Sequence, residues 1–137
     1  MIEQHIMFIR HGETVANQEH IAHGQSDSLL NDRGQEQARS IGKRLLNWPI
    51  PYHRIVSSPL SRARNTAELI NRALHLPLNT DPGLIECDLG DWEGISYEEL
   101  GKHRYAERSI ADDHFAEHNG ESPAVISARL SRTIERL

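Results

Sequence analysis

Short apolar runs alternate with helical stripes along the chain. Residues 6–9 form a continuous apolar run bounded by polar residues, which is typical of a strand buried on both faces of a parallel sheet. Residues 54–57 predict a second buried strand, and residues 76–79 indicate at best a short edge strand. Arg10 and His11 follow the first run directly, so we expect them at the carboxyl end of a strand.

Two helices are expected beside these strands. Asn31 is the predicted N-cap of a helix over residues 32–46, which repeats apolar positions at spacings of three and four. The clearest helix follows Ser58 and Pro59, which predict an N-cap and a proline at the first helical position. Its apolar stripe consists of Leu60, Ala63, Ala67, Ile70 and Leu74.

Two more helices are expected in the second half of the chain. Residues 83–94 form a glycine-punctuated loop, after which Ser96 and Glu99 give the pattern of a capping box. Ser122 and Pro123 repeat the cap-and-proline device before a last apolar stripe. Strands alternating with helices predict an α/β domain, a parallel-type sheet flanked by helices, with its ligand site beyond the carboxyl ends of the strands.

Composition narrows the class of protein. The 137 residues suit a single domain over residues 1–137, and the net charge is −5. The basic residues are spread along the chain, so we expect no nucleic-acid partner. No apolar stretch approaches the length of a membrane span, and no secretory signal is visible. Because Cys87 is the lone cysteine, an internal disulfide is excluded, and we expect Cys87 to be a small packed residue. These features predict a cytoplasmic protein without a membrane partner.

Four motifs occur in a fixed order around the expected site. They are "RHGET" at residues 10–14, "LNDRGQEQA" at 30–38, "SSPLSRARNTA" at 57–67 and "GDWEG" at 90–94. In these motifs the chain resembles the histidine phosphatase superfamily, which contains cofactor-dependent phosphoglycerate mutases, the bisphosphatase domain that acts on fructose bisphosphate, and α-ribazole phosphatases. The resemblance covers nearly the whole chain and implies a phosphoglycerate mutase-like fold.

The resemblance assigns chemistry to four residues. It implies that His11 is the nucleophile that carries a phosphohistidine, and a neutral imidazole suits this role near neutral pH. It implies that Arg10 and Arg62 bind the phosphoryl group, for which bidentate guanidinium groups are better suited than lysine. Glu86 matches the acid that protonates the leaving oxygen, a role that calls for partial burial. Glu93 is expected to brace the same loop.

Further residues are candidates for binding substrate. Asn17 matches an asparagine that helps to hold phosphate, and a local turn role is the competing interpretation. By the resemblance, residues 21–25 border the substrate pocket, so His23, Gly24 and Gln25 are candidate binding residues. An ordinary loop is the alternative for this segment.

A polar stretch near the C-terminal helix raises the question of a metal. Asp112 and Asp113 precede His114 and His118, which are spaced four apart and could hold a divalent ion on a helix. Without a helical pattern, a solvated surface is the favoured interpretation. We therefore expect no metal and no cofactor. Glu13 is expected to be structural or peripheral.

The chain departs from the family in one respect. The family has a second active-site histidine in a Val-x-His-Gly segment on an interior strand after the last helix, and the sequence contains no matching segment. We expect a sheet that lacks this strand. Either the chain is a fragment of a longer protein, which we favour, or it fills the gap by association as a homo-oligomer.

The resemblance leaves three functions to weigh. "GDWEG" and the short stretch from residue 94 to 120 favour the small phosphatases, so we expect a phosphomonoester hydrolase. Its substrate would be a small phosphorylated metabolite, such as α-ribazole phosphate or a sugar phosphate. A phosphoglycerate mutase-type phosphotransferase is one alternative. A noncatalytic phosphate-binding module is the other, and the missing histidine supports it.

Overall fold

A two-stranded parallel sheet lies at the centre of the computed structural model, which describes residues 4–137. Strand β1 (Ile55–Ser57) pairs with β2 (Leu78–Thr80), with Val56 opposite Asn79. Both strands were expected, each within two residues of these bounds. Their parallel pairing, joined through a helix, confirms the α/β class.

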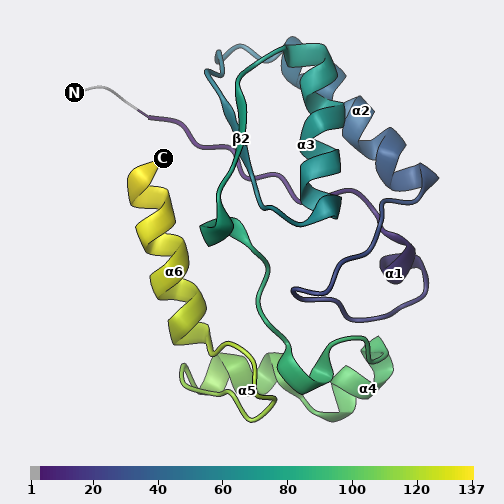
Figure 1. Ribbon diagram of the computed structural model, residues 1–137, viewed down its shortest axis with the longest axis vertical. Coiled ribbons are helices and arrows are strands. Elements are labelled where there is room, and N and C mark those ends of the chain that lie inside the picture. Colours follow the sequence, from purple (N-terminus) through teal and green to yellow (C-terminus); the bar gives the residue numbers. More distant parts are fainter. Residues whose placement is uncertain (1–3) are drawn as a thin grey trace.

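One helix packs on the sheet, and a second packs along that helix. Helix α3 (Ser61–Leu74) contacts both strands, and α2 (Asp32–Leu46) packs along α3 (Figure 1). Helix α2 has the predicted bounds, and the side chain of its N-cap, Asn31, accepts the backbone N–H of Gly34 at 2.8 Å. Ala67 and Ile70 of the predicted α3 stripe are buried, as is Ala38 of α2.

The start of α3 differs from the prediction. Its N-cap is Leu60, and Pro59 lies in a bend before the helix. The Ser58 hydroxyl accepts the backbone N–H of Leu60, two residues ahead, at 3.3 Å. This local turn replaces the expected N-cap geometry and delays the helix by two residues.

The predicted first strand is wrong for this structure. Residues 6–9 form no strand, and their side chains are exposed, with Phe8 71% exposed. An extended segment becomes a strand only by hydrogen bonding to a neighbour, and none of the described residues forms a ladder with this one. The apolar run therefore crosses the molecule as unpaired chain (Figure 1).

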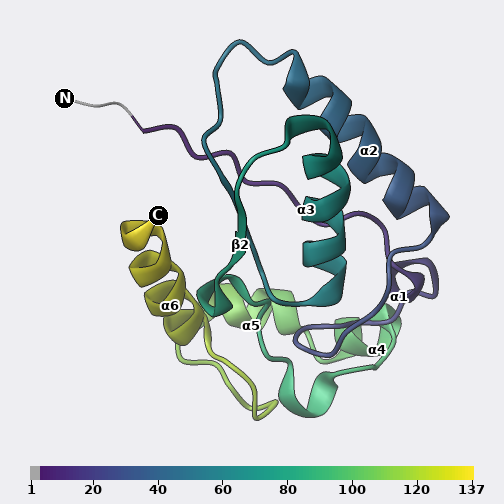
Figure 2. The same cartoon turned by 45° about the horizontal axis from the view of Figure 1, so that its top comes forward.

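The C-terminal half forms a separate group of helices. Helices α4 (Tyr97–Lys102) and α5 (Tyr105–Ala111) lie at one end of the molecule, and α6 (Pro123–Arg136) lies across β2 from α3 (Figures 1 and 2). Helix α6 begins as predicted, with Ser122 as N-cap and proline at its first position. It packs against the short 3-10 turn Pro82–Leu84.

Several short elements were not predicted. Helix α1 (Val15–Gln18) has a capping box between Thr14 and Asn17, but four residues are too few to show a periodic pattern. Helix α5 lacks a side-chain cap, and its N-cap residue, Arg104, has a left-handed backbone with φ of 53°. A second 3-10 turn, Gly90–Trp92, lies within the glycine-rich loop.

The polar stretch over residues 112–120 is irregular, as expected, but it is not a solvated surface throughout. The side chain of His118 is 1% exposed and lies with its ring centroid 5.1 Å from that of Trp92. Tyr105 and the buried Phe115 complete the aromatic cluster. The sequence prediction missed this burial because apolar neighbours come from three separate segments.

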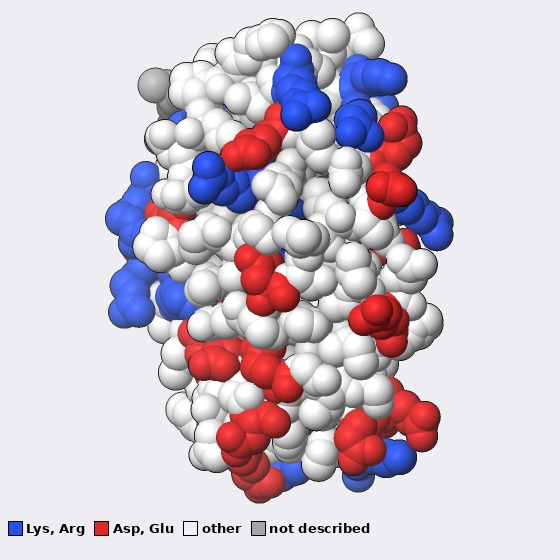
Figure 3. Space-filling model, turned by 45° about the vertical axis from the view of Figure 1, so that its right-hand side comes forward, with Lys and Arg blue, Asp and Glu red and all other residues white. Residues whose placement is uncertain are grey.

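The charged surface has no continuous basic stripe on the face shown in Figure 3, where acidic side chains interrupt the basic ones. Asp and Glu side chains predominate at the end where α4 and α5 lie (Figures 1 and 3). No helix within residues 4–137 combines the length and apolar character that a membrane crossing requires.

Candidate active site

His11 lies half-buried just after the exposed apolar run. Its Nδ1 atom is 2.8 Å from the carbonyl oxygen of Gly12. A carbonyl can only accept, so this contact is a hydrogen bond only when Nδ1 carries the proton. The lone pair of the neutral ring is then on Nε2, which is the atom available for attack.

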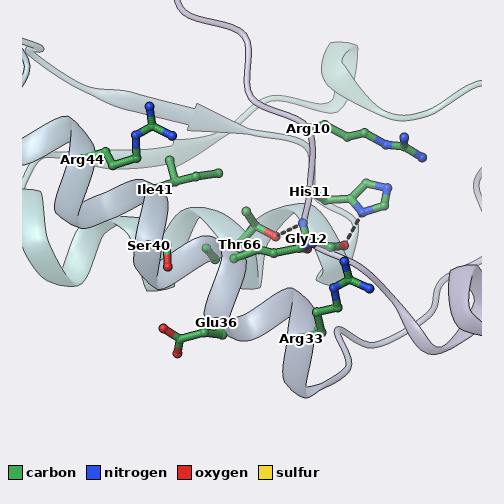
Figure 4. Close-up of a pocket in the computed structure, with 11 residues that line it drawn as sticks. Arg10, His11, Gly12, Arg33, Glu36, Ser40, Ile41, Arg44 and Thr66 are labelled. Carbon is green, nitrogen blue, oxygen red and sulfur yellow. Dashed lines mark hydrogen bonds between the residues drawn. The ribbon is translucent and has the colours of Figure 1, made fainter.

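A hydrogen-bonded chain ties this segment to α3. The backbone N–H of Gly12 donates to the Thr66 hydroxyl at 3.0 Å (Figure 4). That hydroxyl donates to the Arg62 carbonyl at 2.7 Å. Thr66 thus fixes the segment that carries His11 to the helix turn that carries Arg62. Sequence reasoning missed Thr66, although its position four residues after Arg62 places both on one helix face.

The same segment is pressed against the first turn of α2. A Cβ added at Gly34 would lie 2.0 Å from the Glu13 carbonyl oxygen, and one at Gly12 would lie 2.3 Å from the Gly34 carbonyl oxygen. Both obstacles are backbone atoms, which cannot swing aside. Glu13 reinforces the contact by accepting from the Asn31 side chain at 2.7 Å, in keeping with its expected structural role.

Replacement of Gly34 by alanine should therefore displace the His11 segment. We expect Gly34→Ala to lower the free energy of unfolding by about 3 kcal/mol, because the added methyl group overpacks a backbone contact. Gly101→Ala is the matched control, since a Cβ at this helical glycine meets nothing within 4 Å. Urea unfolding measures both, and equal stabilities of the two variants would contradict the packing argument.

The structure brings together the four residues predicted to carry the chemistry. Burial lowers the pKa of His11 most, and the positive charges of Arg62 and Arg10 lower it further. The bond to the Gly12 carbonyl and the charge of Glu86 act in the opposite direction, and the net result is a pKa below the ordinary value of 6.5. The ring is therefore neutral, and nucleophilic, at neutral pH.

Arg62 is buried, with 3% of its area exposed. Its Nη1 donates to the Ser26 carbonyl at 2.8 Å, and its Nη2 donates to the Gly24 carbonyl. Asp27 lies 3.6 Å from Nη1 as a charge partner. A guanidinium group has five N–H donors, so Arg62 can hold this loop and still offer donors to a phosphoryl oxygen.

Glu86 is exposed, so the partial burial that its role calls for is not present in this structure. Its carboxylate accepts the backbone N–H of Cys87 at 2.9 Å. Cys87 itself is half-buried, and burial, followed by the charge of Glu86, raises its pKa to about 11. The thiol is therefore protonated at neutral pH and unsuited to act as a nucleophile.

The predicted substrate residues have local partners. The Asn17 side chain accepts the backbone N–H of Thr14, the N-cap of α1, and donates to the Tyr97 hydroxyl at 3.0 Å. The structure thus shows the local turn role, and phosphate binding by Asn17 stays a prediction. His23 contacts the Ser26 hydroxyl at 2.8 Å. The Gln25 side chain donates to the Glu86 carbonyl at 3.2 Å, which places this loop beside the proposed acid.

A cavity of about 490 Å³ lies between residues 10–12 and α2. The side chains of Arg10 and His11 extend away from Ser40, Ile41 and Arg44 on its helical wall (Figure 4). Arg10, His11 and Gly12 line the side of the cavity opposite this helical wall. Within residues 4–137, no three His, Cys, Asp or Glu side chains gather in positions that could hold a metal ion.

Comparison with known proteins shows the family to which the chain belongs. The family model of the histidine phosphatase superfamily (branch 1) matches residues 6–137. The chain belongs to this superfamily. It is similar to "Uncharacterized phosphatase PhoE" of Bacillus subtilis, with 42% identity over 99 residues that cover 71% of this chain and 49% of that protein. "Probable phosphoglycerate mutase GpmB" of Salmonella arizonae is 35% identical over 130 residues, covering 91% of this chain and 59% of the relative.

Solved structures of phosphatases share this fold. A mycobacterial glucosyl-3-phosphoglycerate phosphatase in complex with VO3 superposes with a TM-score of 0.80 at 32% identity, over 93% of this chain and 61% of that one. A candidate alpha-ribazole-5'-P phosphatase from Escherichia coli gives a TM-score of 0.74 at 32% identity, over 94% and 64%. The expected family and fold class are confirmed, and the chain spans less than two thirds of each of these proteins.

Proposed function

We propose that this chain carries the phosphoryl-transfer site of a phosphomonoester hydrolase that works through a phosphohistidine at His11. The observation that carries the proposal is the hydrogen bond from Nδ1 to the Gly12 carbonyl, which leaves the lone pair on Nε2 of a ring whose pKa is influenced by the charges of Arg62, Arg10 and Glu86. Phosphatases among the relatives support it.

The reaction takes two displacements. The Nε2 lone pair of His11 forms a bond to phosphorus while the ester P–O bond breaks, and protonated Glu86 gives its proton to the leaving oxygen. Glu86, now a carboxylate, takes a proton from water as that water attacks the phosphohistidine, which releases phosphate and restores the ring. Arg10 and Arg62 stabilise the negative charge on the phosphoryl oxygens in both steps.

A small phosphorylated metabolite is the proposed substrate. The named activities of the structural neighbours favour a sugar phosphate or α-ribazole phosphate. Phosphoglycerate mutase-type transfer is the second candidate, because GpmB proteins are among the relatives. The proposal includes no metal or cofactor, since a histidine nucleophile and two arginines suffice for the chemistry.

Product analysis tests this choice. The chain is incubated with glucosyl-3-phosphoglycerate, α-ribazole phosphate or 3-phosphoglycerate, and phosphate and organic products are followed together. A hydrolase releases phosphate from an ester, whereas a mutase converts 3-phosphoglycerate into its isomer without net release. Binding of vanadate without turnover of any ester would instead support a noncatalytic phosphate-binding module and contradict the proposed hydrolase.

The lowered pKa of His11 predicts the pH dependence of this reaction. The ring loses nucleophilicity when it is protonated, so kcat/KM should stay high as pH falls until it reaches the pKa of the folded state. That pKa lies below 6.5, so we expect the midpoint of the acidic limb below pH 6.5. A profile of kcat/KM against pH measures it, and a His11-dependent midpoint at or above 6.5 would contradict the electrostatic account.

A further inference from the structure

Glu93 lies at a junction of two loops and is half-buried there. One oxygen accepts the backbone N–H groups of Gln25 at 2.8 Å and Leu89 at 3.1 Å. The other accepts the backbone N–H of Gly24 at 2.9 Å and the hydroxyl of Ser26 at 2.5 Å. Four donors from two segments thus converge on one carboxylate.

The two loops held by Glu93 carry different parts of the site. Residues 24–26 also supply the carbonyl oxygens that Arg62 binds. Residues 86–89 begin with Glu86, whose carbonyl accepts from the Gln25 side chain at 3.2 Å. A single carboxylate therefore links the loop around the phosphate-binding arginine to the loop that bears the acid.

We propose that Glu93 is a positioning residue that fixes Glu86 relative to Arg62 and His11 by clamping residues 24–26 to residues 86–89. This inference rests on the proposed function for the role of Glu86. Glu93 makes no contact with the reacting atoms, and it acts through the two loops that it joins.

A carboxylate is needed because every partner of Glu93 is a donor. An ionised carboxylate offers only acceptor sites, whereas an amide would turn an NH2 group toward backbone N–H groups and leave them unpaired. Burial raises the pKa of Glu93, but the bonds from Ser26, Gly24, Leu89 and Gln25 outweigh burial and lower it overall, so the group is ionised at neutral pH.

The close contact of the two loops also leaves no room for a side chain at Gly24. A Cβ there would lie 2.1 Å from the Cys87 carbonyl oxygen and 2.6 Å from Oε1 of Glu93. The backbones of the two loops are therefore in direct contact at Gly24 and Cys87. Such close packing transmits a displacement of one loop to the other, which is how loss of the clamp would reach Glu86.

The first readout is the dependence on the leaving group. An alkyl phosphate needs a well-placed acid, and an aryl phosphate with a good leaving group does not. We expect Glu93→Gln to lower kcat/KM for the alkyl ester about tenfold more than for the aryl ester, and Glu93→Asp to recover part of the loss. Asp81→Asn is the control, since Asp81 also accepts a backbone N–H, from Gly83 at 2.7 Å, and binds Arg136. Equal losses for both esters would overturn the proposal.

The second readout needs no turnover and so separates this inference from the proposed function. Glu86 raises the pKa of His11, so Glu86→Gln should lower it in an NMR titration of the imidazole. If Glu93 positions Glu86, Glu93→Gln lowers the His11 pKa in the same direction. A His11 pKa that is unchanged in either variant would overturn the proposal, even in a chain that hydrolyses neither ester. Failure of hydrolysis with both shifts present would refute only the proposed function.

Discussion

Replacement of His11 by asparagine is expected to abolish covalent phosphoenzyme and to lower turnover by at least about 10⁴-fold, because no other group replaces the attacking nitrogen. The fold should survive, since the side chain is only half-buried and its hydrogen bond to Gly12 joins it to the neighbouring residue. Asparagine retains a polar group at the same position. Phosphate release from an aryl ester and the free energy of unfolding measure the two effects.

The control for this substitution is His114→Asn. His114 is exposed, and its contact to Asp112 is made through the backbone N–H, so the variant should keep both stability and turnover. Full phosphatase activity in His11→Asn would show that the nucleophile is another group. A large loss of stability in that variant would show that His11 supports the fold, which its contacts do not predict.

Glu86→Gln is expected to have the second largest effect, and one that depends on the substrate. General acid catalysis contributes about 10²–10⁴-fold, and an amide cannot supply the proton. We expect this full loss in kcat/KM for an alkyl phosphate and a much smaller loss for an aryl phosphate with a good leaving group. Binding of vanadate should change little, since the charge that holds phosphate comes from Arg10 and Arg62.

Glu107→Gln is the matched control for Glu86. Glu107 is an exposed carboxylate in the first turn of α5, and it belongs to neither loop of the site. It should leave the ratio of alkyl to aryl turnover unchanged. If Glu86→Gln also left that ratio unchanged, the acid would be a group other than Glu86. Such a result would fit the exposure of Glu86, because the role of the acid calls for partial burial.

The helices were predicted best, because the cap residues and the apolar periodicity that indicate a helix lie within the helix itself or next to it in the sequence. Asn31 and the periodic residues after it determine where α2 begins and ends, and Ser122 with its following proline does the same for the start of α6. The delayed start of α3 depends on a turn made by the Ser58 hydroxyl, which competes with the N-cap geometry that the same residues allow. Cap residues thus predict that a helix starts nearby, to within about one turn.

Strand prediction failed where it depended on a distant partner. The apolar pattern of residues 6–9 suits a buried strand, but a strand needs a neighbour in space, and the described residues supply none. Burial of His118 was missed for a related reason. Its aromatic neighbours come from separate segments, and a residue is buried by its contacts in space rather than by the polarity of its own stretch.

The site was predictable as a set of residue types but not as a set of contacts. The motifs indicated His11, Arg10, Arg62 and Glu86, and in the structure the charges of the other three influence the pKa of His11. The sequence could not show that Arg62 is buried against the carbonyls of residues 24–26. Hydrogen bonds between loops depend on backbone positions, which local residue patterns do not determine.

The most direct test of the central claim is a rapid-quench measurement of the phosphoenzyme. The chain is mixed with a phosphoryl-labelled aryl phosphate, quenched in base to preserve phosphohistidine, and digested for mass spectrometry. The account predicts label on Nε2 of His11 that forms before phosphate is released and is absent from His11→Asn. Release of phosphate with no labelled histidine, or with label on another residue, would contradict it.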